Sequence, residues 1–349
     1  MKRTDDHILN QDDAKVQRRL RGKDGLATKT GTEALMKLAY HTLDVFTRTR
    51  FGGNPLAVVL DADRLTDAEM QTIAREFNYS ETTFVLRPKD KAHTAHVRIF
   101  TPTVEVPFAG HPNVGTAYAL ALADDAAEEF LFEEAAGLVR AKILRIDGEV
   151  DAVQLNAPQP LSVGKTFTPA SVAACLSLDE ADIALSGHQP CIASVGLGFI
   201  VVEIATRDAL RRAKVDVAAF AAILPTDHAD AIYFYCRELS DEDGAVDFTA
   251  RMFAPFDGLP EDPATGSATA ATCALLAKLA GGAARRFEVA QGIDMGRPSL
   301  LSIAVDADGR VHIRRRLRTG DERHAQRLIN GRRHHRRRPA ACGSPARRR

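Results

Sequence analysis

His111 and Asp262 are the two side chains of this sequence whose placement most suggests proton chemistry. Each directly precedes a proline, in two similar segments about 150 residues apart. A single His or Asp at such a position is usually only a helix cap. Because these two occupy equivalent positions and differ in acid–base character, they could together orient a substrate or relay protons.

The pattern that carries these residues occurs twice. The first copy reads Arg-Ile-Phe-Thr-Pro at 98–102 and Ala-Gly-His-Pro-Asn-Val-Gly-Thr-Ala at 109–117. The second reads Arg-Met-Phe-Ala-Pro at 251–255 and Pro-Glu-Asp-Pro-Ala-Thr-Gly-Ser-Ala at 260–268. Each copy continues into an alanine-rich stretch. The pattern predicts a strand, a loop and a helix built twice, with Pro112 and Pro263 as the first helical residues.

Small residues follow each proline in a way that suits the binding of an anion. Gly115-Thr116 and Gly266-Ser267 are expected in the first turn of the two helices. Free backbone N–H groups and the positive end of the helix dipole attract a carboxylate there, and glycine lets a ligand approach. Plain capping is the better explanation for a single copy, but the matched pair favours a site for a small acid.

Glu81 is the candidate general acid or base, because it stands at the mouth of the apolar strand expected over 80–86. Partial desolvation would raise the pKa of its carboxyl toward neutral pH. The alternative is an exposed glutamate at a strand end, and Glu76, Glu105 and Glu261 are weaker candidates for the same role. The Gly-Gly-Asn-Pro run at 52–55 is either a plain turn or part of the site's lining.

Composition excludes several classes of protein. The chain of 349 residues is 45% hydrophobic, lacks an apolar run long enough to span a membrane, and has a polar start without a secretory signal. Its five cysteines are scattered, which argues against a zinc site or disulfides and for the cytoplasm. No dinucleotide-binding, P-loop, zinc-protease or serine-hydrolase motif occurs. Cysteine is absent before both motif prolines, which disfavours a two-cysteine racemase.

Charge and periodicity divide the chain into four parts. Residues 1–39 are expected to be a disordered or spurious extension, 40–156 a first domain, 161–310 a second domain, and 311–349 a disordered Arg-rich tail. The tail from 310 carries a net charge of +13, whereas 40–309 carries −16. Nucleic acid is therefore an unexpected partner for the body. The tail is either a basic binding segment or the product of an altered reading frame, and in the second case a last strand after 311–313 is missing.

Several ordered blocks of the sequence resemble the PhzF-like family of phenazine biosynthesis, which is related in fold to diaminopimelate epimerase. They cover about residues 40–305. The blocks are Asp-Val-Phe at 44–46, Gly-Asn-Pro-Leu-Ala-Val-Val at 53–59, Asn-Tyr-Ser-Glu-Thr-Thr-Phe-Val at 78–85, the two motif copies, and Gln-Gly-Ile-Asp-Met-Gly-Arg-Pro at 291–298.

The resemblance implies an α+β fold of two pseudo-symmetric domains, each a β-barrel-like sheet around a central helix, with the active site in the cleft between them. It implies proton transfer without a metal or cofactor, and a homodimer. Glu81 would move the proton, His111 and Asp262 would assist it and orient the substrate, and Gly266 and Ser267 would bind the substrate carboxylate. The remaining substrate-binding candidates are Asn54, Ser80, Gly110, Gly115 and Thr116.

The sequence departs from the family at both ends. The family begins near Ala39, and its C-terminal strand is replaced here by the Arg-rich tail, which would leave a sheet edge unpaired. The resulting prediction is a PhzF-like isomerase that acts on a small, cyclic or amino-acid-derived carboxylic acid. Two alternatives remain: an epimerase or racemase that uses the same cleft, and a non-catalytic family member that binds a metabolite or a protein.

Overall fold

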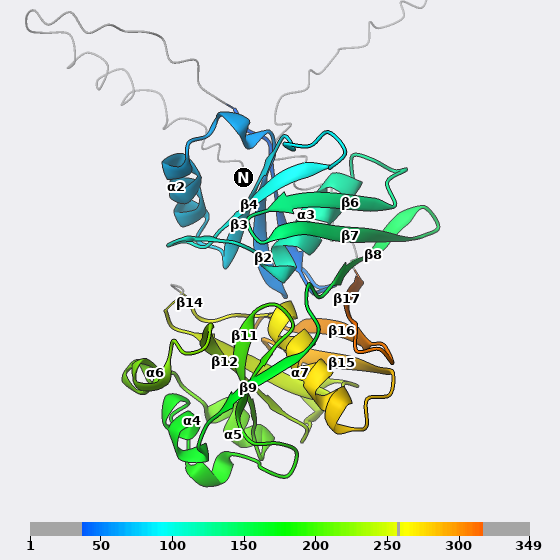
Figure 1. Ribbon diagram of the computed structural model, residues 1–349. Coiled ribbons are helices and arrows are strands. Elements are labelled where there is room, and N and C mark those ends of the chain that lie inside the picture. Colours follow the sequence, from blue (N-terminus) through cyan, green and yellow to red (C-terminus); the bar gives the residue numbers. More distant parts are fainter. Residues whose placement is uncertain (1–36, 257–258, 317–349) are drawn as a thin grey trace, which may run out of the picture. The chain divides into compact units, whose positions relative to one another are not determined.

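The computed structural model describes residues 37–256 and 259–316, and its main compact unit begins at Leu38. The disorder predicted for the N-terminal extension and for most of the tail therefore concerns residues outside the described part. Within the described residues, helices and seventeen strands combine, and the strands form one mixed sheet (Figure 1). The predicted combination of helices and strands is confirmed, and the strands expected in two separate sheets belong to one continuous sheet.

The chain builds two successive sets of elements. The first set contains β1 (Tyr40–Val45), β2 (Asn54–Val59), η1 (Ala62–Arg64), α2 (Asp67–Phe77), β3 (Glu81–Leu86), β4 (Ala95–Phe100), β5 (Glu105–Val106), α3 (Gly110–Ala121), β6 (Glu129–Glu134), β7 (Gly137–Ile146) and β8 (Glu149–Asn156). The second contains β9 (Ser162–Thr166), α4 (Pro169–Cys175), η2 (Glu180–Asp182), β10 (Cys191–Ser194), β11 (Gly198–Glu203), α5 (Arg207–Arg212), α6 (Val217–Ile223), β12 (Ala229–Cys236), η3 (Asp241–Asp243), β13 (Phe248–Ala254), β14 (Leu259–Glu261), α7 (Gly266–Leu279), β15 (Arg285–Gln291), β16 (Ser299–Val305) and β17 (Val311–Arg316).

The two sets repeat the same strand pairings. Strands β2 and β3 pair in parallel, as do β11 and β12, and the parallel pair β4 and β6 corresponds to β13 and β15. The antiparallel pairs of the first set, β1–β2, β3–β4, β4–β5, β6–β7 and β7–β8, each have a counterpart nine strands later. The duplication seen in the motif therefore extends through eight strands of each half.

Strand β17 joins the two halves. It pairs antiparallel with β16 on one side and with β8, the corresponding last strand of the first half, on the other. Val311 and Ile313 are buried, whereas His312 between them is only partly buried and contacts Asn156. The expectation that the Arg-rich tail begins at 311 is wrong, because β17 runs from Val311 to Arg316 and both of its edges are paired. A further strand after β17, of the kind expected to be missing, would lie outside the described residues.

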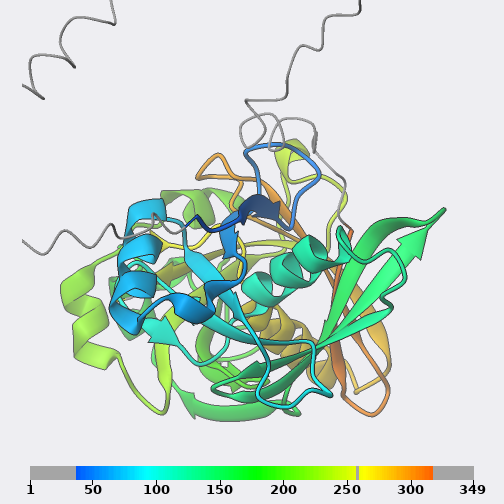
Figure 2. The ribbon, with the colours of Figure 1, turned by 90° about the horizontal axis from the view of Figure 1, so that it is seen from above.

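Each half surrounds one alanine-rich helix. Helix α3 contacts β1, β2, β3, β7 and β8, and helix α7 contacts β10, β11, β15, β16 and β17. Figure 1 shows α3 in teal among the first set of strands and α7 in yellow among the second, and Figure 2 shows the same two helices from above. Nearly every residue of both helices is buried. Small side chains on all faces allow a helix to be enclosed by strands in this way.

Two further observations complete the fold. The capping box expected at Thr66 and Glu69 is present at the start of α2, with the Thr66 side chain accepting from the Glu69 N–H. The largest hydrophobic cluster combines residues of both halves, including Phe132 of β6 and Phe248 of β13. No helix among the described residues is long and apolar enough to cross a membrane.

Candidate functional site

The two motif helices begin at different points of the repeated pattern. Helix α3 begins at Gly110, two residues before Pro112, and its N-cap residue is Ala109. Helix α7 begins only at Gly266, three residues after Pro263, and its N-cap residue is Thr265. The prediction that both prolines are the first helical residues is wrong. His111 consequently lies inside the first turn of α3, whereas Asp262 lies in the loop before α7.

The N-termini of α3 and α7 meet. A β-carbon built on Gly110 would lie 3.8 Å from the backbone nitrogen of Ser267. Gly110 is the first residue of α3 and Ser267 the second of α7, and neither N-cap residue makes a side-chain capping hydrogen bond. Two positive helix ends therefore lie side by side, an arrangement that favours a bound anion.

Glu81 and His111 are in contact at the edge of this region. Glu81 is the first residue of β3, and its Oε2 lies 3.3 Å from His111 Nε2. The histidine side chain is 5% exposed and the glutamate side chain 18% exposed, so both are largely shielded from water. The sequence predicted these two residues for one site, and the fold brings them together from positions thirty residues apart.

Asn54 connects the first motif copy to the second. Its Nδ2 donates to Asp262 Oδ1 (2.7 Å) and to the carbonyl oxygen of Ala264 (3.0 Å), and it lies 3.3 Å from His111 Nδ1. Asn54 is fully buried. The sequence suggested a substrate contact for Asn54, whereas in the structure its amide is engaged between His111 and Asp262, which makes it a link between two site residues.

Asp262 is held through both of its carboxylate oxygens. Thr265 Oγ1 donates to Oδ2 at 2.5 Å, opposite the bond from Asn54 to Oδ1. Gln291 supports the same loop, because its Nε2 donates to the backbone oxygen of Asp262 and its Oε1 accepts from the Thr265 N–H. Thr265 and Gln291 were not assigned a role from the sequence. Gln291 begins the family-like block at 291–298, but the sequence does not show that it contacts Asp262 and Thr265.

Gly115 and Thr116 lie deeper than expected. Because α3 begins at Gly110, they belong to its second turn, where backbone N–H groups bond within the helix. A β-carbon at Gly115 would collide with the Leu56 side chain, and the Thr116 hydroxyl is bonded to Thr83 at 2.9 Å in the core. The first-turn position expected for this pair is therefore wrong, and their surroundings are those of packing residues.

The remaining predicted binding residues keep positions near the helix ends. Gly266 and Ser267 are the first two residues of α7, and Ser267 is partly exposed. Ser80 is buried directly before Glu81. The assignment of substrate contacts to these residues stays a prediction. The site as a whole therefore comprises Glu81, His111, Asn54 and Asp262 beside the starts of α3 and α7.

The alternative glutamates are engaged or exposed elsewhere. Glu105 accepts two bonds from Arg98, at 2.8 and 2.7 Å, and Glu261 accepts two from Arg251, at 2.8 and 2.9 Å. The two pairs occupy equivalent places in the motif copies, where each ties a short strand to the long strand before it. Such bidentate pairs fix geometry. Glu76 is exposed on α2.

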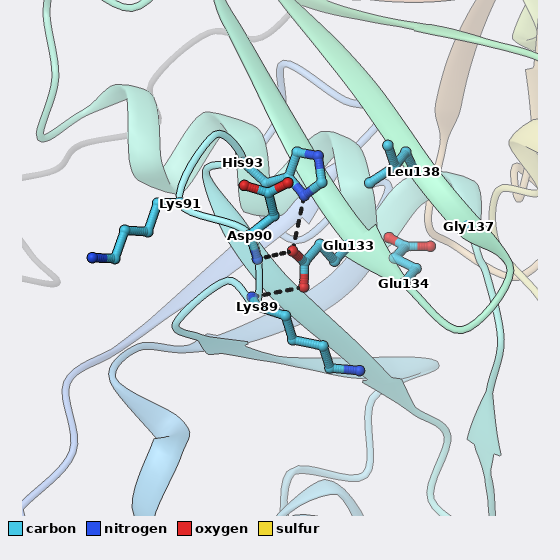
Figure 3. Close-up of a pocket in the computed structure, with 8 residues that line it drawn as sticks. All are labelled: Lys89, Asp90, Lys91, His93, Glu133, Glu134, Gly137 and Leu138. Atoms are coloured by element: carbon cyan, nitrogen blue, oxygen red, sulfur yellow. Dashed lines mark hydrogen bonds and ion pairs between the residues drawn. The ribbon is translucent and has the colours of Figure 1, made fainter.

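A separate cavity of about 730 Å³ lies by the β6–β7 turn and does not include the predicted site residues in its lining (Figure 3). Its Glu133 accepts bonds from the backbone N–H groups of Lys89 and Asp90 and contacts His93, and these interactions hold the pKa of Glu133 at about 2. Burial raises the pKa of the neighbouring Glu134 to about 8. The pKa values of these two adjacent carboxyls are therefore shifted in opposite directions.

Comparison with known proteins identifies the family. Residues 43–321 match the profile of the family described as phenazine biosynthesis-like protein. An uncharacterized isomerase of Mesorhizobium japonicum is 39% identical over 77% of this chain and 91% of its own length. The trans-2,3-dihydro-3-hydroxyanthranilate isomerase of Pseudomonas aeruginosa is 36% identical over 77% of this chain and 91% of its own.

A solved structure agrees with the sequence comparison. A phenazine biosynthesis protein of the PhzF family from Bacillus anthracis superposes with a TM-score of 0.72, at 27% identity, covering 80% of this chain and 96% of that one. The protein therefore belongs to the phenazine biosynthesis-like, or PhzF, family. The resemblance inferred from the motifs is confirmed, and so is the predicted class of enzyme, since the relatives are isomerases.

Proposed function

We propose that the protein catalyses a cofactor-independent proton transfer that moves a double bond in a small, cyclic or amino-acid-derived carboxylic acid. The observation that carries this proposal is the continuous contact from Glu81 to His111 to Asn54 to Asp262. It unites the titratable residues of both motif copies beside two helix N-termini. We further propose that the two halves act as pseudo-symmetric domains and that the substrate lies where the helices meet.

The proposed reaction uses Glu81 as the only proton carrier. Its carboxylate removes a proton from one carbon of the substrate, and the electron pair left behind shifts through the adjacent double bond. The protonated Glu81 then returns a proton to the carbon at the far end of that system, on the same face. Substrate and product contain the same atoms, and Glu81 regains its charge. Position and acid–base chemistry of this kind contribute about 10²- to 10⁴-fold to a rate.

The surrounding residues suit the charges that this reaction develops. The free N–H groups at Gly110, Gly266 and Ser267 would bind the substrate carboxylate. His111 faces Glu81 and would stabilise its anionic form, whereas the anchored Asp262 would accept a hydrogen bond from a hydroxyl or amine of the substrate. A homodimer, expected from the family resemblance, and a cytoplasmic location, expected from the scattered cysteines, belong to the same proposal.

The test is deuterium incorporation and product formation, followed by NMR in D₂O. The full chain is incubated with trans-2,3-dihydro-3-hydroxyanthranilate, the compound named in its Pseudomonas aeruginosa relative, and with other cyclic dienoic hydroxy and amino acids. We expect double-bond migration, and a loss of at least about a hundredfold in Glu81→Gln. Glu76→Gln, which alters an exposed glutamate of α2, is the matched control. Turnover that survives Glu81→Gln would overturn the assignment of the proton carrier.

A further inference from the structure

The orientation of the Asn54 amide determines which nitrogen of His111 carries the proton. Asn54 Nδ2 lies within 3.0 Å of two oxygen acceptors, on Asp262 and Ala264, so the nitrogen rather than the oxygen must face this group. An amide NH₂ can only donate. The two hydrogens of this NH₂ are shared among Asp262, Ala264 and His111 Nδ1, which lies 3.3 Å away. A proton on Nδ1 would point at a nitrogen that cannot accept it, so the unprotonated form of Nδ1 is favoured. In the neutral ring, the proton then resides on Nε2, which faces Glu81.

Arg297 holds the backbone that carries Asn54. Its Nε donates to the carbonyl oxygen of Gly53 (2.8 Å), and its Nη2 donates to that of Gly52 (3.0 Å) and to Asp44 Oδ1 (2.8 Å). The Gly53 N–H in turn donates to the carbonyl oxygen of Pro298. Gly53 has φ of +63°, and a β-carbon there would collide with the Val45 carbonyl oxygen, so this tight backbone conformation requires glycine.

The segment that contains Arg297 also holds the other half of the site. At its start, Gln291 bonds Thr265 and the backbone of Asp262. At its end, the Ser299 hydroxyl donates to the carbonyl oxygen of Pro263. Segment 291–299 therefore contacts the backbone beside Asn54 in the first half and the loop of Asp262 in the second. A displacement of this segment would move Asn54 and its partner Asp262 at once.

We propose that Arg297 is a positioning residue: through the Gly52–Gly53 backbone and the Asn54 amide it fixes His111 in the form that carries its proton on Nε2, directed at Glu81. Its kinetic consequence rests on the proposed function, but the position of the histidine proton does not. Arg297 itself touches backbone and Asp44, so its effect is transmitted through Asn54. Lysine, with a single ammonium group, cannot reproduce the fork that engages Gly52, Gly53 and Asp44 together.

The decisive measurement is the ¹⁵N NMR spectrum of the histidine rings in the full chain, at a pH where His111 is neutral. The two ring nitrogens have well-separated shifts, and His111→Asn assigns the signals. We expect the proton on Nε2 in the wild type, a mixture of both forms in Arg297→Met, and an intermediate result in Arg297→Lys. Arg310→Met, which removes an exposed pair with Asp308, is the control and should leave the spectrum unchanged.

Kinetics and folding supply the second readout. A fall of roughly tenfold to a hundredfold in kcat, with a smaller change in KM, is expected for Arg297→Met, and Arg297→Lys should recover part of it. Circular dichroism establishes whether each variant is folded. If Arg297→Met does not fold, Asn54→Leu replaces it, because this substitution removes the amide donor directly. A wild-type proton on Nδ1 would overturn the proposal, as would an unchanged proton position in both folded variants. If no substrate turns over, the proposed function fails while the ¹⁵N result still decides this inference.

Discussion

The first motif copy, β4–β5–α3, and the second, β13–β14–α7, start from the same pattern and place their titratable residues differently. In both, an arginine of the long strand forms a salt bridge with a glutamate of the short strand. The helix then begins before the proline in the first copy and after it in the second. His111 therefore projects from a helix turn toward Glu81, whereas Asp262 sits in a loop and is anchored by Asn54 and Thr265. A shift in where the helix starts therefore places the titratable residues of the duplicated segments in different surroundings.

The arginine–glutamate pairs offer the strongest way to test whether the copies are equivalent in stability. Arg251 is 10% exposed and also donates to three backbone carbonyls at 210, 211 and 213, whereas Arg98 is 18% exposed and bonds the exposed Asp67. We expect Arg251→Met to lower the free energy of unfolding by about 3–5 kcal/mol, because it leaves buried acceptors unpaired.

Arg98→Met is the matched variant in the first copy. Its partners remain accessible to water after the substitution, so the expected loss is about 1 kcal/mol. Urea denaturation of both variants, at one pH and salt concentration, measures the difference. Equal losses would show that burial does not distinguish the two pairs.

Glu134 and Gln291 occupy corresponding places, since β6 and β15 are the parallel partners of β4 and β13 and end at these residues. Gln291 is an amide that satisfies the start of α7, whereas Glu134 is a buried carboxyl beside Asn113 of α3. Burial raises its pKa from 4.5 to about 8. A raised pKa means that the folded state binds this proton more tightly than the unfolded state does. The contribution of the protonated Glu134 to the free energy of unfolding is therefore fully present below pH 4.5 and is lost as the pH rises toward 8.

Glu134→Gln makes the first copy resemble the second and should remove this pH dependence. Between pH 6 and pH 8 we expect the wild type to lose up to about 2–3 kcal/mol relative to the variant, since one pKa unit corresponds to about 1.4 kcal/mol. Thermal unfolding of both proteins across that range measures it. Glu133→Gln is the control, because the pKa of Glu133 is lowered rather than raised. Parallel curves for wild type and Glu134→Gln would contradict the assignment.

The motif glycines give the smallest expected difference. A β-carbon at Gly115 would collide with the fully buried Leu56 and approach Val45, whereas one at Gly266 would lie 3.1 Å from the Phe46 ring edge. We expect Gly115→Ala to cost about 1–2 kcal/mol through overpacking. Gly266→Ala should cost less than about 1 kcal/mol, because a 3.1 Å approach to the ring edge needs only a small shift of Phe46. Unfolding midpoints of the two variants decide the order, and a reversed order would contradict the packing described for α3.

The sequence was informative where local pattern decides structure. The duplicated motif and the capping box at Thr66 and Glu69 follow from residue types and spacing, whereas the grouping of Glu81 with His111 followed from the resemblance to the PhzF-like family. The predicted helix starts differ from the observed ones by two or three residues, because a proline can stand in the first turn, as Pro112 does, or before the N-cap, as Pro263 does, and tertiary contacts decide between them. Asn54 could not be given its place, since its partner Asp262 lies 208 residues away.

Strand β17 shows where local sequence pattern fails to predict structure. Val311 and Ile313 carried an alternating apolar signal, but the arginines after them argued for an unfolded tail. The strand forms because two partners, β8 and β16, lie on either side of it and pair with its backbone. Backbone pairing of this kind depends on the edges that are available rather than on the residues of the strand alone.

The pairing of β17 with β8 also determines when the first half can complete its sheet during synthesis. The ribosome completes β8 about 160 residues before it completes β17. At about 5–20 residues per second, that delay amounts to roughly 8–30 s. During this interval the nascent first half has one strand edge without its final neighbour, and such an edge can recruit other chains. The first half of the molecule is therefore the earliest to be made, yet it is among the last parts to be closed.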